Sequence, residues 1–346
     1  MASHRRPKQP SRTRVTVLTT AAAAAVALSA NAANAAPSQK LGKDEVKAKV
    51  DKLYEEAEKA TEEYDGAKEK QAKLQKEISA IQDSVAHGQQ ELNKLRDGLG
   101  SMATAQYRSG GIDPSVQLFL SSNPDDYLDK ASTLDQLSAQ QVDALKKVQG
   151  KQRELAQERA EATGKLKDLA ATRTELGNKK KEVQGKLAAA QKLLNSLTAK
   201  EKAQLAAEQQ RASRSSADRV NLGDAPTASG RAAAAFQAAQ TRIGSPYVWG
   251  ATGPSSFDCS GLTSWAYAQA GVSIPRTSQA QANIGTRVYS VSDLKVGDLV
   301  FFFNDIHHVG LYAGNGQILH APRTGTVVRY ESMDTIGGPF MFGVRV

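Results

Sequence analysis

Apolar residues recur in the first half of the chain at alternating steps of four and three residues. The run begins at Val46, and only Gln71 and Gly88 interrupt it. Its other members are Val50, Leu53, Ala57, Ala60, Tyr64, Ala67, Leu74, Ile78, Ile81, Val85, Leu92, Leu95 and Leu99. This spacing places one apolar stripe along a helix and is typical of a coiled coil. Gly98 and Gly100 predict that the helix ends or weakens near residue 100.

A second stretch of helical pattern extends from near Asp125 to about Gln210. One heptad position is apolar throughout and contains Leu155, Ala162, Leu169, Leu176, Val183, Ala190 and Leu197. The other seam position mixes leucines with Gln152, Arg159, Arg173 and Lys180. Two long helices in one chain predict an antiparallel hairpin over residues 40–210. Dimerisation through either seam is the alternative.

Glycine and proline punctuate short apolar segments between the two helical stretches. We expect a compact tip at about residues 100–128. Its apolar side chains around Phe119 and Tyr127 either form a docking surface or pack the turn of the hairpin. Residues 211–230 lose the helical period and are rich in Ser, Ala, Asp, Arg and Gly, which predicts a flexible linker.

Shorter elements follow the linker. An alanine-rich helix is predicted over 231–240, a second helix after Cys259, and a third over 278–284. Strands are then predicted at 299–303, 308–313, 317–321, 326–330 and 340–345. Gly314-Asn315-Gly316 indicates a hairpin between the second and third strands. Residues 231–346 are therefore expected to form an α+β domain, in which the helix carrying the cysteine packs on an antiparallel sheet.

The N-terminus has the pattern of a signal peptide. Five basic residues precede an apolar run over 15–28, and Ala33-Asn34-Ala35 is a small-x-small cleavage site. We expect residues 1–35 to be removed and the protein to be secreted and associated with the cell wall. Loss of five basic residues and no acidic ones would lower the net charge of the 346-residue chain from +9 to +4. That charge argues little for nucleic-acid binding and suits an anionic cell envelope.

Cys259 is the only cysteine of the chain. Phe257-Asp258-Cys259-Ser260-Gly261-Leu262 follows a Gly- and Ser-rich loop and precedes residues at helical spacing, so the thiol is expected at a helix N-terminus. Free N–H groups and the helix dipole there lower the pKa of a thiol and can hold an oxyanion. A lone cysteine is also compatible with a purely structural, buried position. An unpaired thiol in an exported protein is prone to oxidation, which favours a catalytic role.

Histidine is the usual base for a cysteine nucleophile. If a three-residue loop joins the second and third strands, Gly310 opposes His320, and His320 lies on the same sheet face as His308. A two-residue loop would place the two histidines on opposite faces. Cys259, His308 and His320 would then form a triad of nucleophile, base and orienting group.

Three alternatives remain at this point. The histidines can be ordinary strand residues, or His307, on the other face of its strand, can be the base. A zinc site with Cys259 is the third, although a hairpin pair plus one distant thiol matches no familiar ligand spacing.

Five motifs in this region appear in a recognisable order. They are Pro246-Tyr247-Val248-Trp249-Gly250, Phe257-Asp258-Cys259-Ser260-Gly261-Leu262, Pro275-Arg276-Thr277-Ser278, Gly297-Asp298-Leu299-Val300-Phe301-Phe302 and His308-Val309-Gly310-Leu311-Tyr312. Together they resemble the NlpC family of papain-like cell-wall cysteine peptidases, over about residues 231–346.

The resemblance implies Cys259 as nucleophile, His308 as base and His320 as third member. It also implies Tyr247 beside the thiol as an oxyanion or substrate contact, Asp258 and Ser260 along the site, and no cofactor. Proteins of that family cleave peptidoglycan stem peptides, typically between D-γ-glutamate and the diamino acid. A wall amidase or acyltransferase, and a non-catalytic envelope scaffold that activates other hydrolases, are the alternatives.

The helical part has a resemblance of its own. Tyr107-Arg108-Ser109-Gly110-Gly111, followed by Asn123-Pro124-Asp125-Asp126-Tyr127-Leu128, is similar to the coiled-coil regulators and hydrolases of bacterial cell division. This resemblance implies recruitment by the membrane complex FtsE–FtsX. We further expect the coiled coil to regulate access to Cys259.

Overall fold

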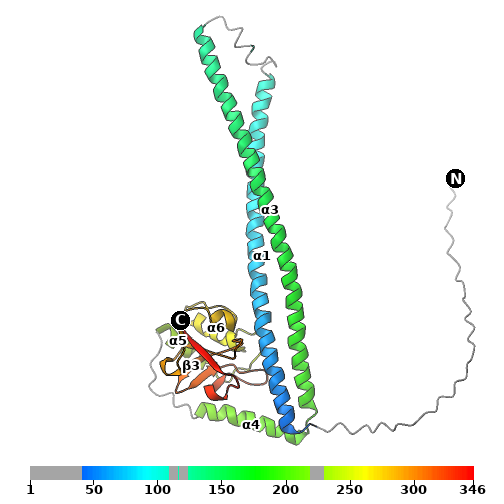
Figure 1. Cartoon of the computed structure of the whole chain (residues 1–346), viewed down its shortest axis with the longest axis vertical. Coiled ribbons are helices and arrows are strands. Elements are labelled where there is room, and N and C mark those ends of the chain that lie inside the picture. The colour runs from blue at the N-terminus through cyan, green and yellow to red at the C-terminus, as the bar shows by residue number, and fades with distance from the viewer. Residues whose placement is uncertain (1–40, 109–115, 117–123, 219–229) are drawn as a thin grey trace, which may run out of the picture. The chain divides into compact units, whose positions relative to one another are not determined.

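The computed structural model describes residues 41–108, 116, 124–218 and 230–346. The expected signal peptide and the expected docking residue Phe119 lie outside these ranges. Within them, no helix has the length and apolar character needed to cross a membrane. The described chain consists of two long helices, a shorter third helix and a C-terminal domain of residues 230–346 (Figure 1).

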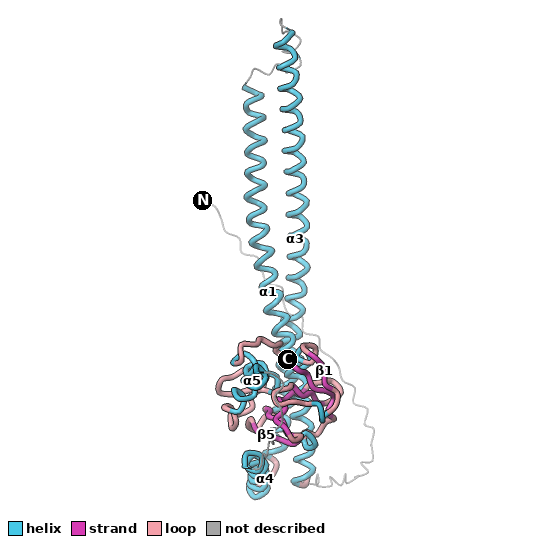
Figure 2. The backbone as a smooth tube through the Cα atoms, turned by 90° about the vertical axis from the view of Figure 1, so that its left-hand side faces the viewer, coloured by secondary structure: helices cyan, strands magenta, loops and turns pink. Residues whose placement is uncertain are grey.

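Helices α1 (Lys43–Arg108) and α3 (Pro124–Asn195) lie side by side and antiparallel (Figures 1 and 2). Seam residues from the two helices meet in small apolar clusters: Leu74 and Ile78 with Leu169, and Leu92 with Val148 and Leu155. The two long helices therefore bury their apolar stripes against each other within one chain.

Gly88 interrupts the apolar seam because of the residue that it faces. A Cβ atom at this position would lie 2.7 Å from Cδ2 of Leu155. Glycine therefore leaves room for a leucine that is only 2 % exposed. Gly98 and Gly100, in contrast, have no atom within 4 Å of a Cβ and do not end the helix. The predicted end near residue 100 is therefore wrong, since α1 continues to Arg108.

The second helical stretch is broken where the sequence predicts one continuous helix. Helix α3 ends at Asn195, and α4 occupies Ala199–Asp218. Thr198 and Glu201 form a capping box: the Thr198 backbone N–H donates to the Glu201 carboxylate (2.8 Å), and the Glu201 N–H donates to the Thr198 hydroxyl (3.3 Å). The predicted linker is also wrong in its first part, because α4 continues to Asp218.

The C-terminal domain contains one antiparallel sheet in the order β1-β6-β2-β3-β4-β5. Its strands are β1 (Thr286–Val288), β2 (Leu299–Phe302), β3 (His308–Gly314), β4 (Gln317–His320), β5 (Arg329–Ser332) and β6 (Phe340–Arg345). Its helices are α5 (Gly230–Gln240), α6 (Cys259–Gln269) and α7 (Ser278–Gln281), with 3-10 turns η1 (Val291–Asp293) and η2 (Met333–Thr335). The α+β class is confirmed. β1 was not predicted, and β5 begins three residues later than the predicted strand.

The two faces of the sheet bury different side chains, as the two-residue period of a strand requires. Phe301, Val309 and Leu311 pack with Phe236 of α5 and Leu262 of α6. The alternate residues face the other way and form a second cluster, which contains Val300, Phe302, Tyr312, Ile318 and Met333. Figure 2 shows the strands of this sheet and its connecting loops. The packed first face fixes α6, and with it Cys259, against β3.

The seam packing predicts the effect of two leucine truncations in α3. Leu155→Ala removes a buried side chain and leaves a cavity opposite Gly88, so it should destabilise the helical pair by about 2–5 kcal/mol. Leu166→Ala is the matched control, because that side chain is 49 % exposed and should have little effect. Urea unfolding followed by the helical circular dichroism signal measures both variants. Equal loss of stability would contradict the packing described above.

Candidate active site

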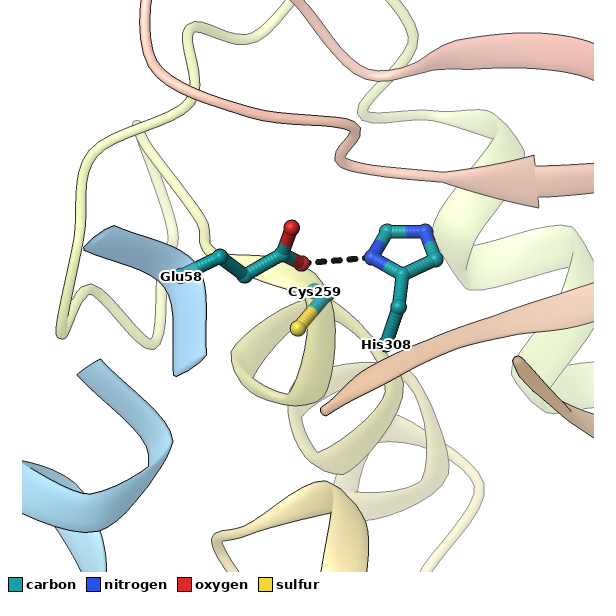
Figure 3. A group of neighbouring side chains, drawn as sticks. All are labelled: Glu58, Cys259 and His308. Atoms are coloured by element: carbon teal, nitrogen blue, oxygen red, sulfur yellow. Dashed lines mark hydrogen bonds and ion pairs between the residues drawn. The ribbon is translucent and has the colours of Figure 1, made fainter. Parts of the chain in front are cut away.

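Cys259 is the first residue of α6 and is completely buried (Figure 3). Asp258 caps the helix: its backbone is extended, and its carboxylate accepts a hydrogen bond from the Gly261 N–H at 2.7 Å. Gly261 is required by a close approach, because a Cβ there would lie 2.1 Å from the carbonyl oxygen of Ala251. The preceding loop therefore lies directly against the helix start and fixes the position of the thiol.

The β3–β4 hairpin brings two histidines together by a route that the sequence did not reveal. The turn has two residues, since Gly314 pairs with Gln317. A register shift between Tyr312 and Gly314 then makes Leu311 pair with Leu319. A Cβ on Gly310 would consequently lie 3.1 Å from the Cβ of His320. The three-residue loop was wrong, but the bulge restores the register that it required.

The two histidines form a hydrogen-bonded chain with a glutamate. Nε2 of His308 lies 2.8 Å from Nδ1 of His320, and Nε2 of His320 lies 3.2 Å from a carboxylate oxygen of Glu331. A carboxylate accepts, so His320 donates from Nε2 and accepts at Nδ1 from the Nε2–H of His308. Glu331 is in turn held by Arg329 at 2.9 Å. The sequence analysis missed Glu331, which lies on β5 without any motif.

The charge states support this direction of donation. Burial, outweighing the Glu331 hydrogen bond, lowers the pKa of His320 to about 4. Burial alone would raise the pKa of Glu331, but the His320 hydrogen bond and the charge of Arg329 lower it to about 2. His320 is therefore neutral and Glu331 ionised near pH 7. His320 acts as an orienting group for the ring of His308.

Helix α1 contributes three acidic side chains to this site: Glu58, Glu62 and Asp65, which we call the acidic stripe. Steps of four and three place them on one face of the helix. Oε1 of Glu58 lies 2.5 Å from Nδ1 of His308, the pair joined by the dashed line in Figure 3. The sequence analysis did not predict this stripe.

The Glu62 carboxylate lies beside the Cys259 thiol. It accepts from the Ser260 hydroxyl at 2.5 Å, from the Ser278 N–H at 2.7 Å and from the Cys259 thiol at 3.4 Å. Glu62 itself is 2 % exposed. The space beside the thiol is therefore filled by a side chain of α1.

Arg276 connects the acidic stripe to the start of α6. Its guanidinium donates to Asp65 at 2.7 Å, to Asp258 at 2.5 Å and to the Ser260 hydroxyl at 2.7 Å. Around this centre, the ring of Tyr64 meets Trp249 edge to face at 5.4 Å. The contact between α1 and the C-terminal domain thus combines ionic and aromatic groups.

The environment of the thiol reverses one prediction. Burial, with the charges of Glu62 and Glu58, raises the pKa of Cys259 well above its usual range. The expected lowering by the helix N-terminus is outweighed, because desolvation and nearby anions both disfavour a thiolate. Burial opposes a charge on His308, yet Glu58 raises its pKa above the ordinary value. These surroundings therefore favour the protonated form of both the thiol and the imidazole.

The remaining candidate residues lie as follows. His307 points its Nδ1 at Asp305 (2.5 Å) and stacks on Phe303, with 4.1 Å between ring centroids. Its carbonyl, rather than its ring, faces the thiol at 3.7 Å. His308 is thus the histidine whose imidazole lies beside Cys259, within 4.8 Å of the sulfur.

Tyr247 is buried, and burial together with the charges of Glu58 and Cys259 raises the pKa of its hydroxyl. The hydroxyl is therefore a proton donor in the neighbourhood of the thiol. Asp258 serves as helix cap and partner of Arg276, and Ser260 is bound by Glu62. A role for these three residues in substrate binding stays a prediction.

A cavity of about 980 Å³ lies along the contact and reaches the histidines. Its lining includes Tyr54 and Glu58 of α1, Leu205 of α4, and His308, His320 and Arg323 of the C-terminal domain. Cys259 does not line it. Solvent therefore has a path to His308 but none through this cavity to the sulfur.

The C-terminal domain is similar to known proteins. Residues 244–341 match the model of the NlpC/P60 family. A probable endopeptidase of Corynebacterium glutamicum (strain R) is 54% identical over 129 residues, which are 35% of this chain and 60% of that protein. A probable endopeptidase of Mycobacterium tuberculosis (strain H37Rv) is 46% identical over 110 residues, 32% of this chain and 28% of that protein. The chain thus spans less than two thirds of these relatives.

Among solved structures, the crystal structure of the NlpC/p60 domain of the peptidoglycan hydrolase SagA is similar at 38% identity. The match covers 33% of this chain and 98% of that one, with a TM-score of 0.31. The region that the family model matches carries both Cys259 and His308. The C-terminal domain of this chain is therefore an NlpC/P60 domain.

Proposed function

We propose that this protein is a secreted peptidoglycan hydrolase that cleaves stem peptides, at the bond between D-γ-glutamate and the diamino acid, with Cys259 as nucleophile. The observation that carries the proposal is the placement of Cys259 at a helix start beside the His308–His320–Glu331 chain. Endopeptidase relatives of this domain support the reaction class. The resemblance described above supplies the bond.

The reaction is an acyl transfer. Nδ1 of His308 takes the thiol proton, and the sulfur forms a bond to the γ-glutamyl carbonyl carbon. Backbone N–H groups at the start of α6 and the Tyr247 hydroxyl would hold the oxyanion. His308 then gives its proton to the leaving amine as the C–N bond breaks. Water, deprotonated by His308, releases the acyl group from Cys259.

The arrangement described here corresponds to a latent enzyme. Glu62 occupies the space beside the thiol, and Glu58 holds the imidazole that has to act as base. Departure of α1 would open that space. It would also remove two anions that raise the pKa of Cys259, so that the helix N-terminus could stabilise a thiolate. Opening therefore changes both access and reactivity.

The helical hairpin is the element through which opening would be driven. A partner that binds the open form more tightly than the closed form shifts the population toward activity. The resemblance to division-associated coiled coils favours the membrane complex FtsE–FtsX as this partner and the cell wall as the location. The tip at about residues 100–128 is the candidate docking surface.

Loss of the nucleophile or base should abolish cleavage once the site is open. In a background with Glu58, Glu62 and Asp65 changed to Ala, Cys259→Ala should be inactive. His308→Ala should lose about 10²–10⁴-fold in rate. Mass spectrometry of muropeptide fragments measures both. His307→Ala is the matched control and should keep most of the activity. Cleavage by the Cys259→Ala variant would refute the thiol mechanism.

Removal of the acidic stripe should activate the protein. Glu58→Ala, Glu62→Ala and Asp65→Ala together should raise muropeptide cleavage at least about tenfold, because the closed population falls. Glu55→Ala with Glu63→Ala is the control, since both side chains lie on α1 but are exposed. Equal rates in wild type, triple variant and control would show that α1 does not restrain the enzyme.

The closed contact should weaken as pH rises. In the closed form, burial and the charge of Asp258 raise the pKa of Glu62 to about 7. Burial also raises the pKa of Asp65 to about 7, although the charges of Arg276 and Lys68 oppose this shift. The closed form thus holds these protons more tightly than the open form, so low pH favours closure. This stabilisation of the closed form is lost progressively as the pH rises from the ordinary carboxylate pKa to about 7.

Trp249 reports this change, because it packs against Tyr64 of α1. A Trp265→Phe background leaves Trp249 as the single tryptophan. The fluorescence emission of Trp249 should then shift to longer wavelength as the pH rises from about 5 to about 8, the range over which the two carboxylates lose their protons. Glu62→Gln with Asp65→Asn should remove most of that dependence. An unchanged pH profile in this double variant would contradict the assignment.

A further inference from the structure

Three potential metal ligands from three separate elements converge at the buried contact. A carboxylate oxygen of Glu58 (α1), the sulfur of Cys259 (α6) and a ring nitrogen of His308 (β3) all lie within 4.8 Å of one another (Figure 3). Each of the three residues is at least nine-tenths buried. Thiolate, imidazole and carboxylate are the three ligand types that zinc accepts in proteins.

The surroundings are rich in acidic groups and poor in cations. Glu58, Glu62, Asp65 and Asp258 are all buried at this contact. Arg276 is the guanidinium that faces them, and it is already bound to Asp65 and Asp258. Glu58 is paired with the ring of His308, and the charge of Arg276 also acts on Glu62. Buried anions in excess favour uptake of a cation, because an unpaired buried charge is costly.

The histidine that would bind the metal already has its outer partners. Nε2–H of His308 donates to His320, which donates to Glu331. This leaves Nδ1 of His308, the nitrogen next to Glu58 and the thiol, as the one that can release its proton and offer a lone pair to a metal. Chains of this kind fix the ring and tautomer of metal-binding histidines in known sites. The sequence could not reveal the site, because Glu58 lies 201 positions before Cys259.

We propose that the closed form of this protein binds a zinc ion through Cys259 Sγ, His308 Nδ1 and a Glu58 carboxylate oxygen, and that the ion holds α1 on the C-terminal domain. On binding, S–Zn, N–Zn and O–Zn bonds replace bonds between the ion and water, and the released water and the protons of the thiol and of Nδ1 pass to solvent. No group is oxidised or reduced. The charges of the thiolate and of Glu58 balance that of the ion.

Zinc is the ion that the donor set selects. Magnesium and calcium prefer oxygen ligands, whereas thiolate and imidazole favour zinc and the softer transition metals. Because one ligand comes from α1 and two from the C-terminal domain, the ion stabilises the closed form and not the open one. The proposed metal site depends only on the positions of its three ligand atoms. Its inhibitory effect rests on the peptidase function proposed above.

Cobalt(II) is the probe for this site, because a thiolate bound to it gives charge-transfer absorption in the near ultraviolet. Titration of the mature full-length protein should produce that band, zinc should displace it, and magnesium should not. Glu58→Gln should weaken zinc binding at least about tenfold, since it removes a charged ligand. Glu55→Gln, one turn earlier on α1 with an exposed side chain, is the matched control and should bind as the wild type does.

The outcomes separate the site from the peptidase function. Absence of the thiolate band in the wild type overturns the proposal. Equal zinc affinity in the Glu58→Gln and wild-type proteins also overturns it, because the metal would then not engage α1. A protein that shows the band and the loss in Glu58→Gln, yet cleaves no muropeptide after removal of zinc and of the acidic stripe, retains the metal site and refutes the proposed function.

Discussion

Burial of α1 carboxylates against the start of α6 is the contact on which the state of this protein depends. Glu62 fills the space beside the sulfur, and Glu58 binds the imidazole. Desolvation of these groups raises the pKa values of the thiol and of Glu62 together. In the proposed mechanism, a single helix face therefore blocks the site sterically and suppresses the thiolate electrostatically, so that closure and inactivity have one physical cause.

The same helix has two faces with different tasks. One stripe packs on α3 through Leu74, Ile78 and Leu92, and the acidic stripe turns toward the C-terminal domain. Both stripes belong to the same regular α-helix, so they move together when that helix rotates or shifts along its axis. A movement of the hairpin relative to the domain would displace all three carboxylates at once. The buried Arg276 would then lose Asp65 while keeping Asp258.

Local signals in the sequence predicted most of the C-terminal domain. The α+β class, the helix after Cys259 and the strand that begins at His308 each follow from a short pattern of their own. The helix break at residues 196–198 was missed although Thr198 and Glu201 form a capping box. The β3–β4 bulge was missed because loop length alone does not reveal a register shift. The acidic stripe was missed because acids at helical spacing are usually solvated, and only tertiary contact distinguishes buried ones from exposed ones.

The most direct test of occlusion by α1 is the rate at which Cys259 reacts with iodoacetamide in the full-length protein. Cys259 is the only cysteine, so a single mass increment reports its modification. Occlusion by α1 predicts slow alkylation in the wild type at neutral pH. Replacement of Glu58, Glu62 and Asp65 by Ala should accelerate it at least about tenfold, because the thiol becomes both accessible and more acidic. Equal alkylation rates in the two proteins would contradict occlusion of the active site by α1.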